Sequence, residues 1–189
     1  MLGAEDAFDL YHLLTSHGIR LWVCGGWGVD ALLGIETRSH HDLDVLMLVD
    51  DVVRLRRLMA RHRYALKDYW EENRWTQDGS GRRVATAFYL HDPHEREFDA
   101  HALQLDERGY GTPCWEKEAG FRFTPADLSG EGFIAGRPVA CISAGLQMAS
   151  HSGYVIPEKQ YGDIERLHQK FALAYPPEYQ RLLEKRGEG

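Results

Sequence analysis

No stretch of this sequence approaches the roughly 20 consecutive apolar residues that a membrane-spanning helix needs. The first residues, MLGAEDAFDLYHLL, also lack the basic start and the small-residue cleavage site of a secretory signal peptide. These two absences predict a protein that remains in the cytoplasm and has no membrane partner.

Cysteine is scarce. Cys24, Cys114 and Cys141 are far apart in the chain, and no CxxC pair occurs. An odd number of isolated cysteines supports neither a disulfide framework nor a cysteine-based zinc site. Free thiols of this kind fit a reducing compartment.

Two familiar catalytic motifs are missing as well. The ten histidines do not form an HExxH motif, because HEREF (94–98) has no second histidine. Ser39, Ser143 and Ser150 lack the surrounding sequence of a nucleophile elbow. The sequence therefore favours neither a zinc enzyme nor a hydrolase with a serine nucleophile.

Positive charge is in short supply. The 22 Lys and Arg residues are outnumbered by 29 Asp and Glu residues, which gives a formal net charge of −7. This balance disfavours non-specific binding to a nucleic-acid backbone. It suits a cationic small molecule as partner, or it simply keeps the protein soluble, and both interpretations stay open.

The pattern of apolar residues predicts an α/β chain whose last third is helical. At 189 residues, the chain is long enough for one good core. Helices are expected over 4–17, 28–33, 50–61, 143–151 and 158–171 and after the Pro176-Pro177 pair, with strands over 20–24, 42–49, 83–90 and 96–105 and a hairpin within 132–143. The segment 67–82 is expected to be an excursion from the core, and 106–132 is expected to be irregular.

Two aspartates one residue apart begin the apolar strand DLDVLMLV. Because side chains alternate along a strand, Asp42 and Asp44 point to the same face. Burying two carboxylates together is costly unless a cation compensates, and Mg²⁺ typically takes one or two carboxylates plus water and substrate phosphates. A third carboxylate is expected nearby, with Asp99 as the central candidate and Glu97 as its competitor on the same strand face. The pattern predicts a magnesium site.

A glycine pair lies a short distance before this strand. Because Gly25 and Gly26 have no Cβ atoms, their backbone N–H groups can approach phosphate oxygens closely. A helix that starts just after the pair would direct its positive end to the same place. The pair by itself predicts only a tight turn, but together with the carboxylates it favours a phosphate site.

The order of these motifs resembles the nucleotidyltransferase superfamily that includes DNA polymerase β. GGWGVDALLG (25–34) followed by TRSHHDLDV (37–45) is similar to the antibiotic nucleotidyltransferases of the lincosamide and aminoglycoside 2''-O types. Three later segments continue the resemblance. The family's third-carboxylate strand is similar to FDAHAL, and its hairpin is similar to GFIAGRPVACIS. The lincosamide branch of the family is similar to QMASHSGYVIPEKQYGDIERL. The resemblance extends from about Leu21 to Phe171 and implies a nucleotidyltransferase core with a short mixed sheet and a helical C-terminal region.

The resemblance also implies a reaction. Asp42, Asp44 and Asp99 would hold Mg²⁺, two ions in all, against the triphosphate of ATP or another NTP. Asp99 would accept the proton of an antibiotic hydroxyl, which attacks the α-phosphate and expels pyrophosphate. The residues expected to bind the nucleotide are Gly25, Gly26, Trp27, Asp30, Arg38, His40 and Lys159. For Arg38, a structural ion pair with one of the aspartates is an equal alternative.

Four residues are candidates for contact with the acceptor. His151 and Tyr154 match the family pattern, although a helix end with Tyr154 packed on the core is the competing interpretation. Trp70 offers a stacking surface, and Glu71 beside it could attract an amine.

The sequence thus predicts an adenylyltransferase with a catalytic core over 1–105 and a C-terminal region over 106–189, hairpin then helices, that completes the substrate cleft. A lincosamide is the first choice of acceptor and an aminoglycoside the second, and a homodimer stays open. Two other hypotheses use the same fold, namely an antitoxin-like module that binds a protein and an enzyme that modifies a protein hydroxyl. The presence of all three carboxylates favours an enzyme over the first of these.

Overall fold

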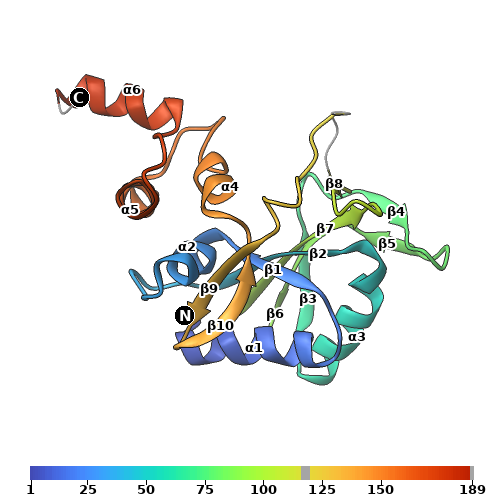
Figure 1. Ribbon diagram of the computed structural model, residues 1–189. Helices are drawn as coiled ribbons and strands as arrows, with labels where there is room; N and C mark the ends of the chain where they lie inside the picture. Colours follow the sequence, from blue (N-terminus) through green and yellow to red (C-terminus); the bar gives the residue numbers. More distant parts are fainter. Residues whose placement is uncertain (116–119, 188–189) are drawn as a thin grey trace.

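A mixed β-sheet forms the centre of the protein (Figure 1). The structure is a computed structural model, and it describes residues 1–115 and 120–187. The strands of this sheet are β1 (Leu21–Cys24), β2 (Asp42–Leu48), β3 (Ala65–Tyr69), β6 (Ala87–His91), β7 (Glu97–Leu105), β8 (Gly111–Pro113), β9 (Gly130–Ile134) and β10 (Arg137–Cys141), and a separate small sheet holds β4 (Trp75–Gln77) and β5 (Arg83–Ala85). The helices are α1 (Ala4–Ser16), α2 (Gly25–Leu33), α3 (Val52–Arg61), α4 (Ala144–Ala149), α5 (Tyr161–Phe171) and α6 (Pro177–Arg186), with 3-10 turns at η1 (Val49–Asp51) and η2 (Glu158–Gln160).

The strand order explains why residues distant in sequence meet. The order is β3-β6-β7-β2-β1-β10-β9, and β8 pairs with β7. Strand β2 runs parallel to β7, and β1 runs parallel to β10, whereas β1 and β2 are antiparallel. The expected α/β class with a mixed sheet is confirmed. The predicted hairpin is β9–β10, and it joins the same sheet as the first 105 residues through β1.

Alternation along β2 separates the two faces of the sheet. Leu43, Val45 and Met47 are buried in the core cluster that includes the apolar stripes of α1 and α3. Each such side chain contributes roughly 1.5–3 kcal/mol of stabilisation by burial. Leu46 points the other way, into a smaller apolar cluster. Since α1 and α3 both lie on one side of the sheet (Figure 1), the aspartates of β2 are on the opposite face.

Helix α2 begins three residues before the expected start at position 28. The backbone of Gly25 has a φ of +59°, in the left-handed region that glycine adopts without strain. This conformation lets the chain turn directly from β1 into the helix, so the glycine pair forms the first turn of α2. Helix α2 ends as expected at Gly34, whose φ is +77°.

Two other local expectations were wrong. The strand predicted over 83–90 is divided at Thr86, because Asn73 Oδ1 accepts from the N–H groups of Thr86 (2.9 Å) and Ala87 (3.1 Å). The 106–132 segment, expected to be irregular, includes β8 and the start of β9. The 67–82 segment is an excursion as expected, since β4 belongs to the separate small sheet. Strand β8 is held on one side by β7 and on the other by two 2.8 Å backbone bonds between Gly111 and Phe123.

The C-terminal helices lie on the side of the sheet away from α1 and α3 (Figure 1). Helix α5 packs against α2 and α4, and Tyr179 of α6 is buried against Tyr161 of α5, with ring centroids 5.4 Å apart. Among the described residues, we find no helix with both the length and the apolar character needed to cross a bilayer.

Candidate active site

The three predicted carboxylates Asp42, Asp44 and Asp99 lie together with Glu97 at the start of β2. The parallel register between β2 and β7 places Asp42 opposite Glu97 and Asp44 opposite Asp99, all on the same sheet face. Burial raises the pKa of the Asp44 carboxyl, and the nearby charges of Asp42 and Asp99 raise it further. The cluster therefore carries unfavourable negative charge that a cation would relieve.

The register also separates the two candidates for the third carboxylate. Glu97 lies beside Asp42 and forms an ion pair with Lys67 of β3. Asp99 lies beside Asp44 and is 7% exposed. Since Asp99 is the buried carboxylate of this group and Glu97 already has a cationic partner, the geometry favours Asp99.

Asp99 is held from one side by aromatic residues. Trp70 Nε1 donates a hydrogen bond to Asp99 Oδ1 (2.9 Å), and His101 Nδ1 lies 3.3 Å from the same oxygen. His101 Nε2 in turn lies 3.0 Å from Glu72 Oε1. Burial lowers the pKa of His101, but the carboxylates of Asp99 and Glu72 outweigh it and leave that pKa above its ordinary value. Glu71 and Glu72, both expected to be able to attract an amine, are both exposed, and Glu72 is the one that makes this contact.

The glycine pair lies directly against this cluster. A Cβ atom on Gly25 would overlap the Asp44 carboxylate, and one on Gly26 would overlap the side chains of His40 and Arg38. The first turn of α2 therefore approaches the acidic cluster more closely than a residue with a side chain could. Its backbone N–H groups are available to an anion at the same place.

We expect Gly25→Ala to lower kcat/KM by at least about 10-fold, because the new methyl group displaces Asp44 and the positive φ disfavours alanine by about 1 kcal/mol. Gly34→Ala is the matched control, since Gly34 has a φ of +77° and its Cβ would meet nothing within 4 Å. Both variants should melt at a lower temperature, but only Gly25→Ala should lose activity. A folded Gly25→Ala protein with wild-type kcat/KM would contradict the assignment.

Three of the residues predicted to bind nucleotide are buried behind the glycine pair. Asp30 accepts hydrogen bonds from Thr37 N (3.0 Å) and from His40 Nε2 (2.6 Å). The Trp27 and His40 rings lie 4.4 Å apart, and Trp27, Asp30 and His40 are each about 2% exposed. In this arrangement they hold the 34–41 loop against α2, so they would influence a ligand through the residues they position.

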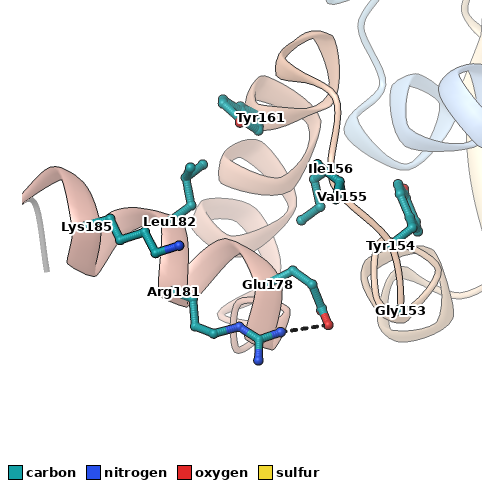
Figure 2. A pocket seen from close by; sticks show the side chains of 9 residues that line it. All are labelled: Gly153, Tyr154, Val155, Ile156, Tyr161, Glu178, Arg181, Leu182 and Lys185. Atoms are coloured by element: carbon teal, nitrogen blue, oxygen red, sulfur yellow. Dashed lines mark hydrogen bonds and ion pairs between the residues drawn. The ribbon is translucent and has the colours of Figure 1, made fainter.

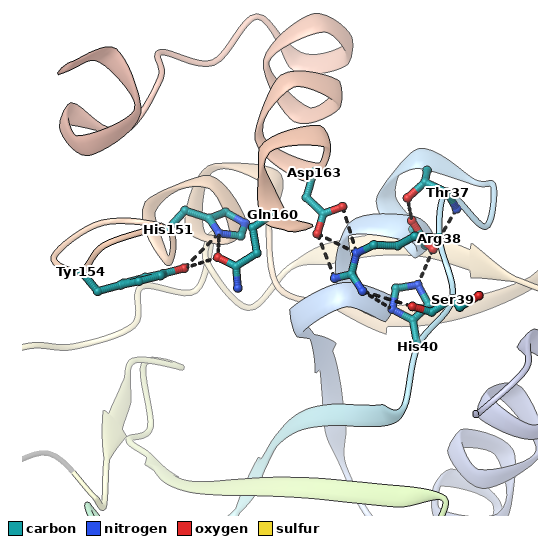
Figure 3. Close-up of polar contacts among 9 residues, drawn as sticks. Thr37, Arg38, Ser39, His40, His151, Tyr154, Gln160 and Asp163 are labelled. Carbon is teal, nitrogen blue, oxygen red and sulfur yellow. Dashed lines mark hydrogen bonds and ion pairs between the residues drawn. The ribbon is translucent and has the colours of Figure 1, made fainter. Parts of the chain in front are cut away.

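Arg38 connects this loop to the C-terminal helices (Figure 3). Its guanidinium group binds Asp163 of α5 through Nε (3.1 Å) and Nη2 (2.9 Å), while Nη1 lies 3.1 Å from His40 Nδ1. Because arginine can only donate, His40 Nδ1 accepts and His40 Nε2–H is the donor to Asp30. The expected structural alternative for Arg38 was an ion pair with one of the aspartates, and the partner is Asp163, which the sequence did not single out.

His151, Tyr154 and Gln160 form a second polar group near Arg38 (Figure 3). His151 Nδ1 lies 3.2 Å from Tyr154 Oη and 3.3 Å from Gln160 Oε1, and Tyr154 Oη donates to Gln160 Oε1 (2.7 Å). Burial lowers the pKa of His151. Lys159 is exposed in η2, next to this group. The predicted C-terminal residues are thus neighbours of one another.

Two hollows flank these residues. One, of about 470 Å³, lies between the 153–156 segment and α6, where Glu178 and Arg181 form an ion pair along the helix (Figure 2). None of the three carboxylates lines it. The other, of about 540 Å³, is lined by Gly25 and His101 and extends along the sheet face away from the carboxylates. Only the second is adjacent to the acidic cluster.

The donor set fits magnesium. In residues 1–115 and 120–187, no three His, Cys, Asp or Glu side chains are arranged to hold a metal by themselves. Mg²⁺ commonly takes one or two carboxylates and completes its shell with water and phosphate oxygens, so the pair Asp42 and Asp44 is sufficient when a phosphate is bound. Burial and the charges of Asp42 and Asp99 raise the pKa of Asp44, and a cation bound beside these carboxylates would lower it.

Comparisons with known proteins indicate the family of this chain. A family model described as Aminoglycoside-2''-adenylyltransferase matches residues 7–167. A lincosamide resistance protein from Staphylococcus haemolyticus is 26% identical over 165 residues, which cover 86% of this chain and 92% of the relative. The crystal structure of a lincosamide antibiotic adenylyltransferase with lincomycin bound has a TM-score of 0.72 at 25% identity, covering 86% of this chain and 94% of its own. ANT(2'')-Ia in complex with adenylyl-2''-tobramycin has the same fold, with a TM-score of 0.66 at 18% identity over 97% of this chain and 95% of its own.

Proposed function

This chain belongs to the aminoglycoside-2''-adenylyltransferase family, and we propose that it transfers a nucleoside monophosphate from MgATP to a hydroxyl of a lincosamide-type antibiotic. It is a nucleotidyltransferase, as its relatives are. The observation that carries the proposal is the contact between the first turn of α2 and the paired carboxylates Asp44 and Asp99. Phosphoryl transfer requires mainly positioning and charge neutralisation, and this contact offers both.

In the proposed reaction, the acceptor hydroxyl oxygen forms a bond to the α-phosphorus. The bond from that phosphorus to the bridging oxygen breaks, and pyrophosphate leaves. Asp42 and Asp44, with Asp99 beside them, would hold Mg²⁺, two ions in the expected arrangement, which neutralises phosphate charge when bound. Gly25 and Gly26 would bind phosphate oxygens through their N–H groups.

Asp99 would receive the proton of the attacking hydroxyl. The described side-chain contacts to its carboxylate, from Trp70 and His101, go to Oδ1. They fix the carboxylate and leave Oδ2 as the acceptor. Under this proposal Trp70 holds the base Asp99 and also lines the acceptor side of the site. Glu71, which is exposed next to it, would attract an amine of the acceptor.

The second half of the chain would complete the cleft. Under this proposal Arg38, Lys159, His151 and Tyr154 lie where the loop at 34–41 faces α5 and η2. We therefore propose a catalytic core over 1–105 and a region over 106–189 that completes the cleft. The β9–β10 hairpin of the second region belongs to the sheet of the core. A cytoplasmic location and the use of ATP rather than another NTP are parts of the same proposal.

An aminoglycoside is the second candidate acceptor, and the family model favours it. The two lincosamide relatives, at 26% and 25% identity, favour the first. A protein acceptor is less well supported, because a hollow of about 540 Å³ beside the carboxylates is within the size range of small-molecule sites.

The direct test is pyrophosphate release with Mg²⁺ and each NTP, against a panel of lincosamides and aminoglycosides, with mass spectrometry of the products. A lincosamide that gains one nucleoside monophosphate supports the proposal. Transfer to aminoglycosides alone would make an aminoglycoside the acceptor in place of a lincosamide. Nucleotide binding without transfer to any of these compounds would overturn the proposal that the acceptor is an antibiotic of either class.

The Arg38–Asp163 ion pair gives a separate prediction. We expect Asp163→Asn to raise the KM for NTP several-fold and to destabilise the fold by about 2 kcal/mol, because a buried hydrogen bond to a charged group is lost and Arg38 is released. Asp78→Asn is the matched control, since Asp78 is also buried and bonds Arg82. The control should lower the melting temperature without changing the KM. Equal KM values in the two variants would leave the ion pair a purely structural role.

A further inference from the structure

The hollow of about 540 Å³ beside the carboxylates has an apolar wall. Leu46, Phe123 and Ile142 are buried in the smaller apolar cluster of the sheet, and Trp115 and Leu146 pack against that cluster. These residues come from β2, from the chain on either side of the 116–119 segment, from the end of β10 and from α4. The wall is therefore assembled by the tertiary structure from four separate parts of the chain.

One end of this hollow opens on the reacting groups. Gly25, which lines it, lies against Asp44, and His101, which also lines it, lies 3.3 Å from Asp99. The ring of Trp115 meets the edge of the His101 ring with centroids 5.0 Å apart. A molecule with a hydroxyl at Asp99 would thus place its remaining atoms along the wall.

The polar groups around the hollow already have partners within the protein. Both ring nitrogens of His101 are engaged, Nε2 by Glu72 and Nδ1 by Asp99. Ser150 Oγ donates to the carbonyl oxygen of Gln147 (2.8 Å). What the hollow offers to a ligand is mainly apolar surface.

We propose that this hollow is the acceptor subsite and that it binds an alkyl substituent of an amphipathic acceptor, in preference to a nucleobase or a polycationic sugar. The inference rests on the proposed function, and it adds which kind of acceptor the site prefers. Among the described lining residues there is no carboxylate, and several ammonium groups placed against such a wall would lose their hydration without an ion-pair partner. A nucleobase would leave the polar edge of its ring unpaired for the same reason.

The test measures binding and transfer separately. Lincosamides that differ only in the length of the alkyl chain are titrated calorimetrically against wild type and Leu146→Ala, with Mg²⁺ and a non-hydrolysable ATP analogue. We expect Leu146→Ala to weaken binding of the long-chain compound about 10-fold and that of the short-chain compound less than threefold, because the lost contact is with the chain. The Kd for the ATP analogue should change less than twofold.

Leu182→Ala is the matched control, because Leu182 is also half-buried but lines the hollow beside α6. It should leave both affinities unchanged. Ala149→Glu, at an exposed lining position, adds a carboxylate without removing core packing and should weaken the long-chain compound selectively. This second variant keeps the test valid if Leu146→Ala folds poorly.

Two results would overturn the subsite: weaker binding of the ATP analogue with unchanged lincosamide binding, or equal losses for long and short chains. Failure of wild type to bind either lincosamide would overturn it as well. Wild-type binding with the expected chain-length effect, but without transfer, would uphold the subsite and refute the proposed reaction. The two proposals can therefore fail independently.

Discussion

Asp44→Asn is expected to lower kcat by at least about 10³-fold while the protein stays folded. The side chain loses the charge that would hold Mg²⁺ against the triphosphate, and metal-based stabilisation of transition-state charge is worth several kcal/mol. The register that pairs Asp44 with Asp99 and the close approach of Gly25 both place this carboxylate at the centre of the cluster. Steady-state pyrophosphate release with saturating Mg²⁺ measures the loss.

The same substitution should not reduce stability when divalent metal is absent. Burial, Asp42 and Asp99 raise the pKa of the Asp44 carboxyl above its ordinary 3.8, so the folded protein binds this proton more tightly than the unfolded chain does. The stabilising effect of that proton is present below the unfolded pKa and is lost as pH rises through the folded one. At pH 7 ionised Asp44 is therefore destabilising, and Asp44→Asn should melt at the same or a higher temperature.

Glu97→Gln is the control for charge removal from this face. Glu97 lies on the same side of β7 but is paired with Lys67, so its substitution should change kcat less than threefold. Loss of activity in Glu97→Gln equal to that in Asp44→Asn would move the third carboxylate from Asp99 to Glu97. Near-wild-type turnover of Asp44→Asn would refute the metal assignment itself.

Asp99→Asn is expected to retain binding of MgATP and to lose transfer by about 10²–10⁴-fold, the range that a general base supplies. Asparagine keeps an oxygen that can accept from Trp70, so the local geometry should survive while the basic oxygen is lost. Calorimetric titration with a non-hydrolysable ATP analogue measures the first effect, and single-turnover transfer measures the second.

Trp70→Phe separates the base from its support. The indole N–H that holds Asp99 Oδ1 is removed while an aromatic ring remains, so kcat should fall by about 10-fold, much less than in Asp99→Asn. A Trp70→Phe protein that instead loses only acceptor affinity would assign Trp70 to stacking with substrate. If Asp99→Asn retained full turnover, neither Asp99 nor its hydrogen-bond partners would act on the proton.

Much of the site could be predicted from short stretches of sequence because the features concerned are local. Alternation along a strand places Asp42 and Asp44 on one face wherever the strand lies in the fold. A glycine pair followed by a helical segment favours an anion site for reasons confined to its own backbone. The helices expected over 4–17 and 50–61 also follow from local apolar periodicity, and the structure forms both as α1 and α3.

Local boundaries were predicted less well, and each error has an identifiable cause. The positive φ of Gly25 moved the start of α2 to the glycine pair, and the side chain of Asn73 interrupted the strand at Thr86. Both effects depend on one backbone conformation or one side-chain bond. Neither alters the hydrophobic periodicity from which the elements were predicted.

The sequence alone therefore determined the α/β class, the family resemblance and the residue types needed for metal-assisted transfer. The tertiary structure alone decided which carboxylates lie side by side (Asp44 with Asp99, and Asp42 with Glu97), the partnership of Arg38 with Asp163 and the apolar wall beside His101. The physical reason is distance along the chain: Arg38 and Asp163 are 125 positions apart, and no local pattern encodes which buried charge will find which partner. Strand order and helix packing make that choice when the sheet forms.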